Sequence, residues 1–431
     1  MTTFLIATMP LVGHVNPLRP IARALVDRGH DVRWYTGRRF RTAVESTGAR
    51  FVPVAAGIDH LSADLDQVLP GRAGRTGMDG IKFDVKHAFI DPAPTQVTDL
   101  RRLVAADSVD AVIADLGVVG SALFHELTGV PWVTVGITPL AIPSRDTAPF
   151  GPALPPSATT SGRIRNLVLN VLIDKVVMRD VRAHYQRTRA MVGLGPKAGP
   201  FIGAVSPLLH LQNGVPELEY PRSDLPPQVH FVGALADRPT AAPQLPDWWA
   251  DVASSHRPVV HVTQGTVADD NLDNLVLPTI RALAGEDVLV VAGTGRTDPA
   301  TLGPLPANVR VAPFVPHGWL LPHTSVMVTN GGFGGVQAAL SEGVPLVVAG
   351  ATEDKPEVAA RVAWAGVGVD LRTGSPTPER IRAAVREVLD QKRYAARAAE
   401  LSHEFAARDA GAISAALIEQ LVRTRTPVAR P

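Results

Sequence analysis

Residues 328–337, with the sequence VTNGGFGGVQ, decide the fold of the second half of this chain. An apolar run leads into a glycine-rich turn, after which apolar residues recur at the spacing of one helix face as far as Gly343. The segment predicts a buried strand that turns through glycines into a helix. Backbone N–H groups at the start of such a helix favour anions, so we interpret the turn as a diphosphate site. A tight structural turn is the alternative, since the P-loop ending and the dinucleotide fingerprint spacing are both absent.

Short apolar runs bounded by turn residues recur on both sides of this segment, with helical patterns between them. This alternation is typical of parallel strands that are buried on both faces, and it predicts an α/β protein with two doubly wound, Rossmann-like sheets. The expected strands are residues 4–8, 32–36, 111–114 and 132–138 in the first half, and 259–263, 288–292, 309–314, 326–329 and 346–349 in the second.

The domain organisation follows from length and from the distribution of proline. At 431 residues the chain exceeds what one hydrophobic core usually organises. We predict a first domain over 1–230, a proline-bearing linker over 231–257, a second domain over 258–405 and a C-terminal helix over 406–431, with a break near Gly411. Residues 57–94 and 142–162 lack periodicity and are expected to be irregular segments that shape a ligand site.

The composition gives the class of partner. The chain is 45% hydrophobic, 19% charged and carries a net charge of +1, which gives no electrostatic reason to expect a nucleic acid or an anionic membrane. It contains no cysteine, which excludes disulfides and thiolate metal sites. The apolar N-terminus lacks a basic region, and no apolar run is long enough to span a bilayer. We expect a cytoplasmic protein, monomeric or homodimeric, that binds small molecules.

Two residues of the first half could form an acid–base pair. His14 lies in the expected turn between the first strand and the first helix, and Asp115 directly follows the strand over 111–114. A neutral imidazole can accept a proton at neutral pH, and a carboxylate can orient it. Taken alone, His14 could equally be a capping or surface residue, and Asp115 could be a helix N-cap.

Five segments of the second half resemble the nucleotide-sugar glycosyltransferases of the GT-B fold, which include plant secondary-metabolite and bacterial antibiotic enzymes of the macrolide type. These segments are FVPH at 314–317, NGGFGG at 330–335, GVP at 343–345, EDK at 353–355 and GVG at 366–368. Their order and gaps are similar to those of bacterial members, and the similarity spans nearly the whole chain. The resemblance implies two Rossmann-like domains facing a cleft, with the C-terminal helix crossing back to the first domain.

The resemblance implies roles for individual residues of the second domain. Aromatic stacking suits a flat nucleotide base, and helix-start amides suit a diphosphate. The residues implied to bind the nucleotide base and ribose are Phe314, Val315 and His317. Those implied to bind the phosphates are Gly265, Thr266, Asn330, Gly332, Gly334, Gly335 and Val336, and those implied to bind the sugar are Asp354 and Lys355.

Three positions depart from the family pattern. Asn330 replaces a histidine, and its amide can donate a hydrogen bond to phosphate but cannot become cationic. Ala338 stands where a glutamate commonly holds the ribose hydroxyls, which leaves the choice between UDP and dTDP sugars open. Lys355 replaces a glutamine, so the sugar pocket is not expected to be a standard glucose pocket.

The resemblance also implies the reaction. A hexose would pass with inversion, without a metal ion or other cofactor, from a UDP- or dTDP-sugar to a hydroxyl or a nitrogen of an apolar natural product. His14 would be the base and Asp115 its partner. Two alternatives stay open: an epimerase or phosphorylase acting on a nucleotide sugar, and a non-catalytic protein that binds a sugar nucleotide or an aglycone.

Overall fold

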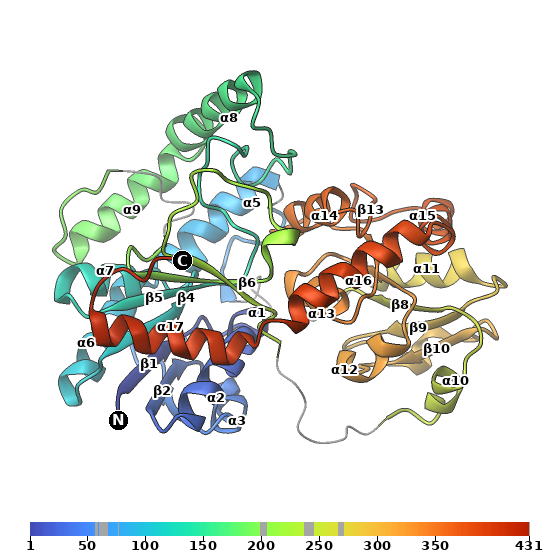
Figure 1. Ribbon diagram of the computed structural model, residues 1–431, viewed down its shortest axis with the longest axis horizontal. Coiled ribbons are helices and arrows are strands. Elements are labelled where there is room, and N and C mark those ends of the chain that lie inside the picture. The colour runs from blue at the N-terminus through green and yellow to red at the C-terminus, as the bar shows by residue number, and fades with distance from the viewer. Residues whose placement is uncertain are drawn as a thin grey trace.

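The computed structural model describes residues 1–56, 59, 68–75, 77–198, 205–236, 245–265 and 271–430. These residues form two lobes that lie side by side, each built around one parallel β-sheet (Figure 1). In the described part of the first lobe the sheet has the strand order β3 (Arg50–Pro53), β2 (Asp31–Thr36), β1 (Thr3–Ala7), β4 (Ala111–Asp115), β5 (Trp132–Gly136), β6 (Leu209–Asn213) and β7 (Val229–Gly233).

The second lobe repeats this architecture, which confirms the predicted fold class. Its strand order among the described residues is β10 (Val309–Ala312), β9 (Leu289–Gly293), β8 (Val259–Thr263), β11 (Val326–Thr329), β12 (Leu346–Val348) and β13 (Gly368–Asp370). All pairings between these strands are parallel.

Successive residues of the central strands are buried in different hydrophobic clusters. In β1, Phe4 and Ile6 pack into one cluster, whereas Leu5 and Ala7 pack into another on the opposite face. Because side chains alternate between the two faces of a strand, helices must cover both faces, and this is why the strand reads as a continuous apolar run.

All nine predicted strands are present, with ends that differ by one or two residues, but β3, β6, β7 and β13 were missed. In β6 the polar His210 and Gln212 are fully buried on one face and hydrogen-bond to each other at 3.1 Å. Thr134 Oγ1 contacts the other nitrogen of His210 at 2.9 Å. A buried polar face of this kind lacks the apolar run that we used to find strands. β3 and β13 are short strands at the edges of their sheets.

The helices of the first lobe begin with a one-turn helix that carries His14. The next helix buries Ile21, Ala22 and Leu25, and the chain leaves it through Gly29 at φ +81°. The described helices of this lobe are α1 (Val12–Val15), α2 (Arg19–Asp27), α3 (Arg41–Glu45), α5 (Gly77–Asp84), α6 (Ala93–Ala106), α7 (Val119–Thr128), α8 (Thr160–Leu172) and α9 (Arg179–Met191), with π-helical turns η3 (Val85–Ile90) and η4 (Ile173–Val177) and 3-10 turns η1 (Asn16–Leu18), η2 (Arg38–Phe40) and η5 (Pro216–Leu218).

The first predicted irregular segment is partly helical. α5 and η3 occupy residues 77–90, where we predict an irregular segment, so this prediction is wrong for these residues. Residues 57, 58, 60–67 and 76 lie outside the described residues. Neither helix buries a strong apolar stripe: α5 has no buried residue, and η3 buries only Ala88 and Ile90. The periodicity that marks a helix is therefore weak here. In the second predicted irregular segment, α8 begins at Thr160 after an irregular stretch.

The second lobe has a helix directly after the glycine-rich turn, as predicted. This helix runs from Phe333 to Ser341, and Gly343 follows it at φ +71°. The described helices of this lobe and of the C-terminus are α10 (Trp249–Ala253), α11 (Val276–Leu283), α12 (His317–Leu320), α13 (Phe333–Ser341), α14 (Lys355–Trp364), α15 (Pro378–Asp390), α16 (Lys392–Ala406) and α17 (Ala410–Thr424), with 3-10 turns η6 (Leu272–Asn274), η7 (Pro299–Leu302) and η8 (Leu321–His323). None of the described helices is both long and apolar enough to span a membrane.

The last helix, α17, returns to the first lobe and packs on α2 (Figure 1). Its buried residues Ala415, Ile418 and Leu421 belong to the same hydrophobic cluster as β1. The predicted break near Gly411 is present but lies slightly earlier, at residues 407–409 between α16 and α17; α17 begins at Ala410 and is capped by the Asp409 carboxylate, which accepts a hydrogen bond from Ala412 N at 2.9 Å. Gly411 instead permits close packing, since a Cβ there would lie 2.9 Å from Pro20 O.

The predicted linker begins too early. Residues 231–233 complete β7, where Phe231 pairs with Gln212 of β6. Trp248 packs on the second lobe and donates a hydrogen bond from Nε1 to Val311 O at 3.0 Å. Residues 237–244 lie outside the described residues. The described residues of the predicted linker therefore pack on the two lobes.

The strand orders place one switch point in each sheet. The direction of winding reverses between β1 and β4 in the first sheet and between β8 and β11 in the second. Ligands of doubly wound sheets bind outside the carboxyl ends of the strands at these points. His14 follows β1 and Asp115 ends β4, while Gly265 follows β8 and Asn330 follows β11. These four predicted site residues therefore lie at the switch points of the two sheets.

Candidate active site

His14 and Asp115 form a hydrogen-bonded pair at the switch point of the first sheet. His14 Nδ1 lies 2.8 Å from Asp115 Oδ1, the Asp115 side chain is fully buried, and the His14 side chain is 17% exposed. His14 lies in α1 instead of the predicted turn, because the N–H groups of His14 and Val15 both donate to Leu11 O. The pair therefore presents one accessible imidazole edge on a rigid helical turn.

Three donors surround the Asp115 carboxylate. Oδ2 accepts Met9 N at 2.8 Å, and Oδ1 accepts Gly117 N at 2.6 Å in addition to the imidazole. Because a carboxylate only accepts hydrogen bonds, His14 must carry its proton on Nδ1, which leaves Nε2 as an acceptor toward solvent. The pair has the arrangement of a general base and its orienting carboxylate. Asp115 is not a helix N-cap, since Val118 has that position in α7.

Two residues that we did not predict contact the pair. The Phe89 ring, from η3, stacks near the His14 ring at a centroid distance of 6.1 Å and an interplanar angle of 27°. A Cβ at Gly117 would lie 2.9 Å from Asp115 Oδ1 and 3.0 Å from His14 Cε1, so only glycine fits there without displacement. The spacing of Gly117 two residues after Asp115 was a usable signal, whereas Phe89 has none in the sequence.

The glycine-rich turn of the second lobe forms the expected helix start. Gly331 has φ +85°, and a Cβ there would meet Val348 Cγ1 at 2.8 Å, which explains the need for glycine. The first intrahelical hydrogen bond of α13 runs from Val336 N to Gly332 O at 3.0 Å. The N–H groups of Phe333, Gly334 and Gly335 precede it and are the helix-start donors. Val336, which we had included as a phosphate donor, already uses its amide within the helix.

Asn330 lies at this turn but points its amide inward. Its Nδ2 donates to Gln264 O, and its Oδ1 accepts Gly332 N at 3.4 Å. One of the two N–H groups of the amide that we expected to donate to a phosphate is therefore engaged within the protein, because β8 and β11 are neighbours and the carbonyl that follows β8 binds the side chain. Gly265 lies beside it at φ +77°, and Thr266 is outside the described residues.

The segment that we expect to bind the nucleotide base follows β10. Phe314 is 67% exposed, as a stacking surface would need to be, whereas Val315 is buried in the core. His317 begins α12 and contacts His261 of β8 with ring centroids 5.5 Å apart. Burial lowers the pKa of His317, and burial together with His317 lowers the pKa of His261 to about 3. Both imidazoles are therefore neutral at physiological pH.

The two expected sugar residues lie at the start of α14, where their environments differ. Burial raises the pKa of Asp354 to about 6, against the opposing charge of Lys355, and the charge of His14 from the other lobe also acts on this carboxyl. Lys355 is 7% exposed; its Nζ donates to Thr352 Oγ1 at 3.3 Å and forms an ion pair with Glu353. Asp354 thus lies near His14, while Lys355 is held by its own turn.

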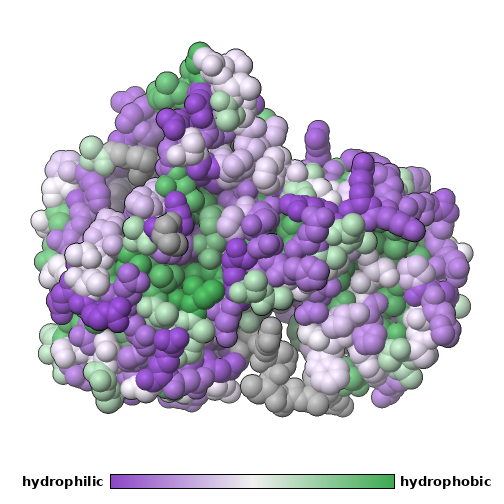
Figure 2. Space-filling view, in the orientation of Figure 1, coloured by the Kyte–Doolittle hydropathy of each residue, from purple (hydrophilic) through white to green (hydrophobic). Residues whose placement is uncertain are grey.

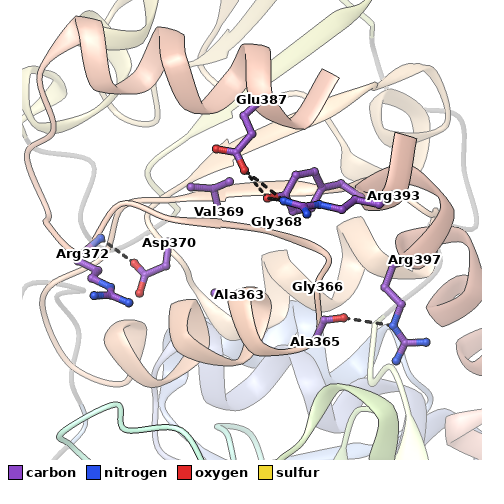
Figure 3. Close-up of a pocket in the computed structure, with 11 residues that line it drawn as sticks. Ala363, Ala365, Gly366, Gly368, Val369, Asp370, Arg372, Glu387, Arg393 and Arg397 are labelled. Atoms are coloured by element: carbon purple, nitrogen blue, oxygen red, sulfur yellow. Dashed lines mark hydrogen bonds and ion pairs between the residues drawn. The ribbon is translucent and has the colours of Figure 1, made fainter. Parts of the chain in front are cut away.

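One further pocket lies away from all of these residues. Figure 3 shows it at the end of α14 and along β13, with Arg372, Arg393 and Arg397 among its lining side chains and a volume of about 610 Å³. Arg393 and Arg397 are engaged with Tyr394 and Glu400. No predicted site residue lines it. Among the residues that the structure describes, no group of three or more His, Asp or Glu side chains could hold a metal ion.

Comparisons with known proteins agree with this geometry. Residues 275–421 match the family model described as "Erythromycin biosynthesis protein CIII-like, C-terminal domain". The chain is 49% identical over 425 residues to 4′-demethylrebeccamycin synthase of Lentzea aerocolonigenes, covering 97% of this chain and 99% of that protein. It is 38% identical to UDP-glycosyltransferase 2 of Phaeomoniella chlamydospora, covering 94% of this chain and 92% of that protein.

A solved structure has the same fold. The glycotransferase of kitacinnamycin superposes with a TM-score of 0.75 at 24% identity, over 97% of this chain and 98% of that chain. At this identity the likeness concerns the fold, and both lobes are included in it.

Proposed function

Because the chain belongs to the nucleotide-sugar-dependent glycosyltransferases of the GT-B fold, which include antibiotic glycosyltransferases, we propose that it transfers a hexose with inversion from a UDP- or dTDP-sugar to an apolar natural product. The acceptor atom is a hydroxyl oxygen or a nitrogen. The observation that carries this proposal is the His14–Asp115 pair in the first lobe, in which a partly exposed imidazole lies 2.8 Å from a buried carboxylate.

In the proposed reaction His14 Nε2 takes the proton of the acceptor group as that atom attacks the anomeric carbon. The bond from the anomeric carbon to the diphosphate oxygen breaks, and the nucleoside diphosphate leaves with the negative charge. Asp115 stabilises the imidazolium through Nδ1. The amides of Phe333, Gly334 and Gly335 stabilise the leaving group, because the helix dipole and unpaired N–H groups favour an anion. A single displacement of this kind inverts the anomeric configuration and uses no metal ion.

An apolar acceptor is supported by the surface of the first lobe. Figure 2 shows hydrophobic surface rising to the top of this lobe, where Figure 1 places α8. Ile164, Leu167, Val168 and Val171 of α8 are each more than half exposed. Exposed apolar surface of this extent usually marks a binding region. The relative from Lentzea is named for 4′-demethylrebeccamycin, and we propose the aglycone of that compound as the first acceptor to test.

The proposal is tested by nucleotide binding and by product analysis. UDP, dTDP and their glucose conjugates should raise the melting temperature, because a ligand that binds only the native state stabilises it. Incubation of UDP- or dTDP-glucose with the aglycone should release the nucleoside diphosphate and yield a β-linked product, and EDTA should leave the rate unchanged. Isomerised donor or phosphate-dependent cleavage without acceptor would contradict the proposal.

Gly334→Val should weaken nucleotide binding by about tenfold or more. Gly334 has no positive φ, and open space surrounds the position of a Cβ there, so valine is tolerated by the fold but adds bulk beside the proposed diphosphate. Isothermal titration with UDP and dTDP measures the change. Gly195→Val is the matched control, since that glycine also has open space and no positive φ but lies in the first lobe. If both variants bind UDP and dTDP with equal affinity, the diphosphate does not bind at the start of α13.

Asp354→Asn should stabilise the fold at neutral pH and weaken sugar binding. The pKa of Asp354 is raised from 3.8 to about 6, so between these values the folded chain keeps a proton that the unfolded chain releases. This contribution to stability is present below pH 3.8 and is lost as the pH rises through about 6. Asparagine should therefore raise the melting temperature at about pH 7.5 and leave it nearly unchanged at about pH 3, below both pKa values.

The same variant separates sugar from nucleotide recognition. Loss of the charged hydrogen-bond acceptor should lower the affinity for UDP-glucose or dTDP-glucose by about tenfold. The affinity for UDP or dTDP should not change. Asp370→Asn, a carboxylate at the end of β13 in the same lobe, is the control. A melting temperature that falls at neutral pH, or a parallel loss of UDP affinity, would contradict the assignment of Asp354.

A further inference from the structure

A buried cluster of four charges joins the two lobes beside the proposed sugar residues. Glu219 and Arg222 come from the first lobe after η5, and Glu357 and Arg361 come from α14 of the second. Arg361 Nε donates to Glu219 Oε1 at 2.7 Å, Arg361 Nη1 donates to Glu357 Oε2 at 2.7 Å, and Arg222 Nη1 donates to Glu219 Oε1 at 3.2 Å. The two glutamates and Arg361 are each at most 6% exposed. The cluster is neutral.

Glu357 also binds a loop of the first lobe. Its Oε1 accepts Gly151 N at 2.7 Å and Ala153 N at 2.8 Å, although more than 200 residues separate them in sequence. These residues belong to the irregular segment between β5 and α8. The same segment is held a second time at Leu140, whose N–H donates to Glu219 Oε2 at 2.8 Å and whose carbonyl accepts from Arg222. The segment is therefore attached to α14 directly at one end and through Glu219 and Arg361 at the other.

The backbone of this loop is held in a conformation that the sequence does not favour. Ala153 has φ +56° and Gly151 has φ +124°. A non-glycine residue in the left-handed region is strained and persists only where its surroundings fix it. The two amides that converge on Glu357 supply that restraint here. Without the carboxylate, both N–H groups would lose their partner and Ala153 would lose the reason for its conformation.

The distribution of charge allows the lobes to separate. Each lobe contributes one carboxylate and one guanidinium that already pair with each other, Glu219 with Arg222 and Glu357 with Arg361. Removing one partner from a buried ion pair is costly, because it leaves an uncompensated charge. If the lobes move apart, neither lobe keeps an unpaired charge, so the contacts between them can break and re-form. The hydrogen bonds from Gly151 and Ala153 to Glu357 exist only when the lobes are together.

Glu357 is two residues after Lys355 and three after Asp354, in the first turn of α14. We propose that Glu357 is a positioning residue that fixes the Gly151–Ala153 loop of the first lobe against the sugar end of the second, so that the hexose passes to the acceptor instead of to water. This inference rests on the proposed function. Glu357 does not touch the reacting atoms; it acts through the loop whose amides it binds.

The test measures the loop and the reaction separately in the full chain. In Glu357→Gln, amide hydrogen exchange of Gly151 and Ala153 should accelerate by about tenfold, because an amide is a weaker acceptor than a carboxylate and presents donors of its own. With UDP- or dTDP-glucose and the aglycone of 4′-demethylrebeccamycin, the ratio of donor hydrolysis to transfer should rise several-fold. The dissociation constants of UDP and dTDP should not change. A ratio of two rates is unaffected by a lower folded fraction, so a merely structural role would leave it constant.

Glu126→Gln is the matched control, since Glu126 forms ion pairs with Arg189 and Lys197 within the first lobe. It should change neither the exchange of the loop nor the ratio. Ala153→Pro provides a second route if Glu357→Gln does not fold: proline removes the N–H and excludes φ +56°, while Ala153→Gly keeps both. The proline variant should accelerate exchange at Gly151 and raise the ratio of hydrolysis to transfer, and the glycine variant should behave as the parent chain.

Several outcomes would overturn the inference. Unchanged exchange at Gly151 and Ala153 would show that Glu357 does not hold the loop, and accelerated exchange with an unchanged ratio would show that the loop does not guide transfer. If the parent chain neither transfers nor hydrolyses the donor, the proposed function fails and the positioning role fails with it. The exchange measurement in that case still decides whether Glu357 restrains the loop.

Discussion

His14→Ala should lower the rate of transfer by about 10²–10⁴-fold while leaving the affinity for UDP or dTDP unchanged. His14 is the partly exposed member of the pair with Asp115, and its Nε2 is the atom with access to an acceptor. Removing it takes away proton removal from the acceptor but not the amides of α13 in the other lobe. Steady-state rates with the aglycone, together with titration of the nucleotide, measure the two quantities.

The control for this variant is His323→Ala. His323 is exposed in the second lobe and contacts Trp249, away from the proposed site. It should transfer at the parental rate. If His14→Ala transfers at the parental rate, His14 is not the base. If the rate and the nucleotide affinity fall by the same factor, His14 serves donor binding and not proton transfer.

The parallel sheets and the convergence of His14 with Asp115 could be predicted because both depend on local patterns. Each residue follows an apolar strand, and doubly wound sheets bring the carboxyl ends of neighbouring strands together. The glycine-rich turn between β11 and α13 was predictable for the same reason: its glycines precede a helix with a clear apolar face. These features need only a strand, a turn and a helix in the right order.

Other features depend on which segments become neighbours in space, and the sequence does not contain this information in a readable form. The contact between the Asn330 amide and Gln264 O arises because β8 lies beside β11, and the sequence around Asn330 does not indicate it. Phe89 reaches His14 from a π-helical turn 75 positions along the chain. Glu219 and Glu357 look like solvated charges in the sequence, yet both are buried where the lobes meet.

The second large effect is expected for Asp115→Asn, which should lower transfer by about 10²–10⁴-fold without removing the base. The carboxylate accepts three hydrogen bonds, from Met9 N, Gly117 N and His14 Nδ1. An asparagine has one oxygen and one NH2 group, so it cannot accept at both former oxygen positions. If its NH2 group faces His14, the imidazole must carry its proton on Nε2 and can no longer act as a base.

The opposite orientation carries a different cost. If the asparagine oxygen faces His14 and Gly117, its NH2 group opposes the buried N–H of Met9, which loses its acceptor. An unsatisfied buried donor costs about 1–3 kcal/mol, so this orientation should appear as a lower melting temperature. The variant therefore loses either the His14 form that is protonated on Nδ1 or part of its folding stability. Chemical shifts of the His14 ring nitrogens show which of the two occurs.

Asp110→Asn is the matched control for this variant. Asp110 immediately precedes β4, and its carboxylate accepts a single backbone hydrogen bond, from Thr3 N at 2.9 Å, without contacting a histidine. An asparagine can keep that one bond through its oxygen, so transfer should stay at the parental rate. If Asp115→Asn transfers as fast as Asp110→Asn while the His14 nitrogens show the Nε2-protonated form, the imidazole cannot be the group that takes the acceptor proton. The base must then be sought among the other residues near Asp354.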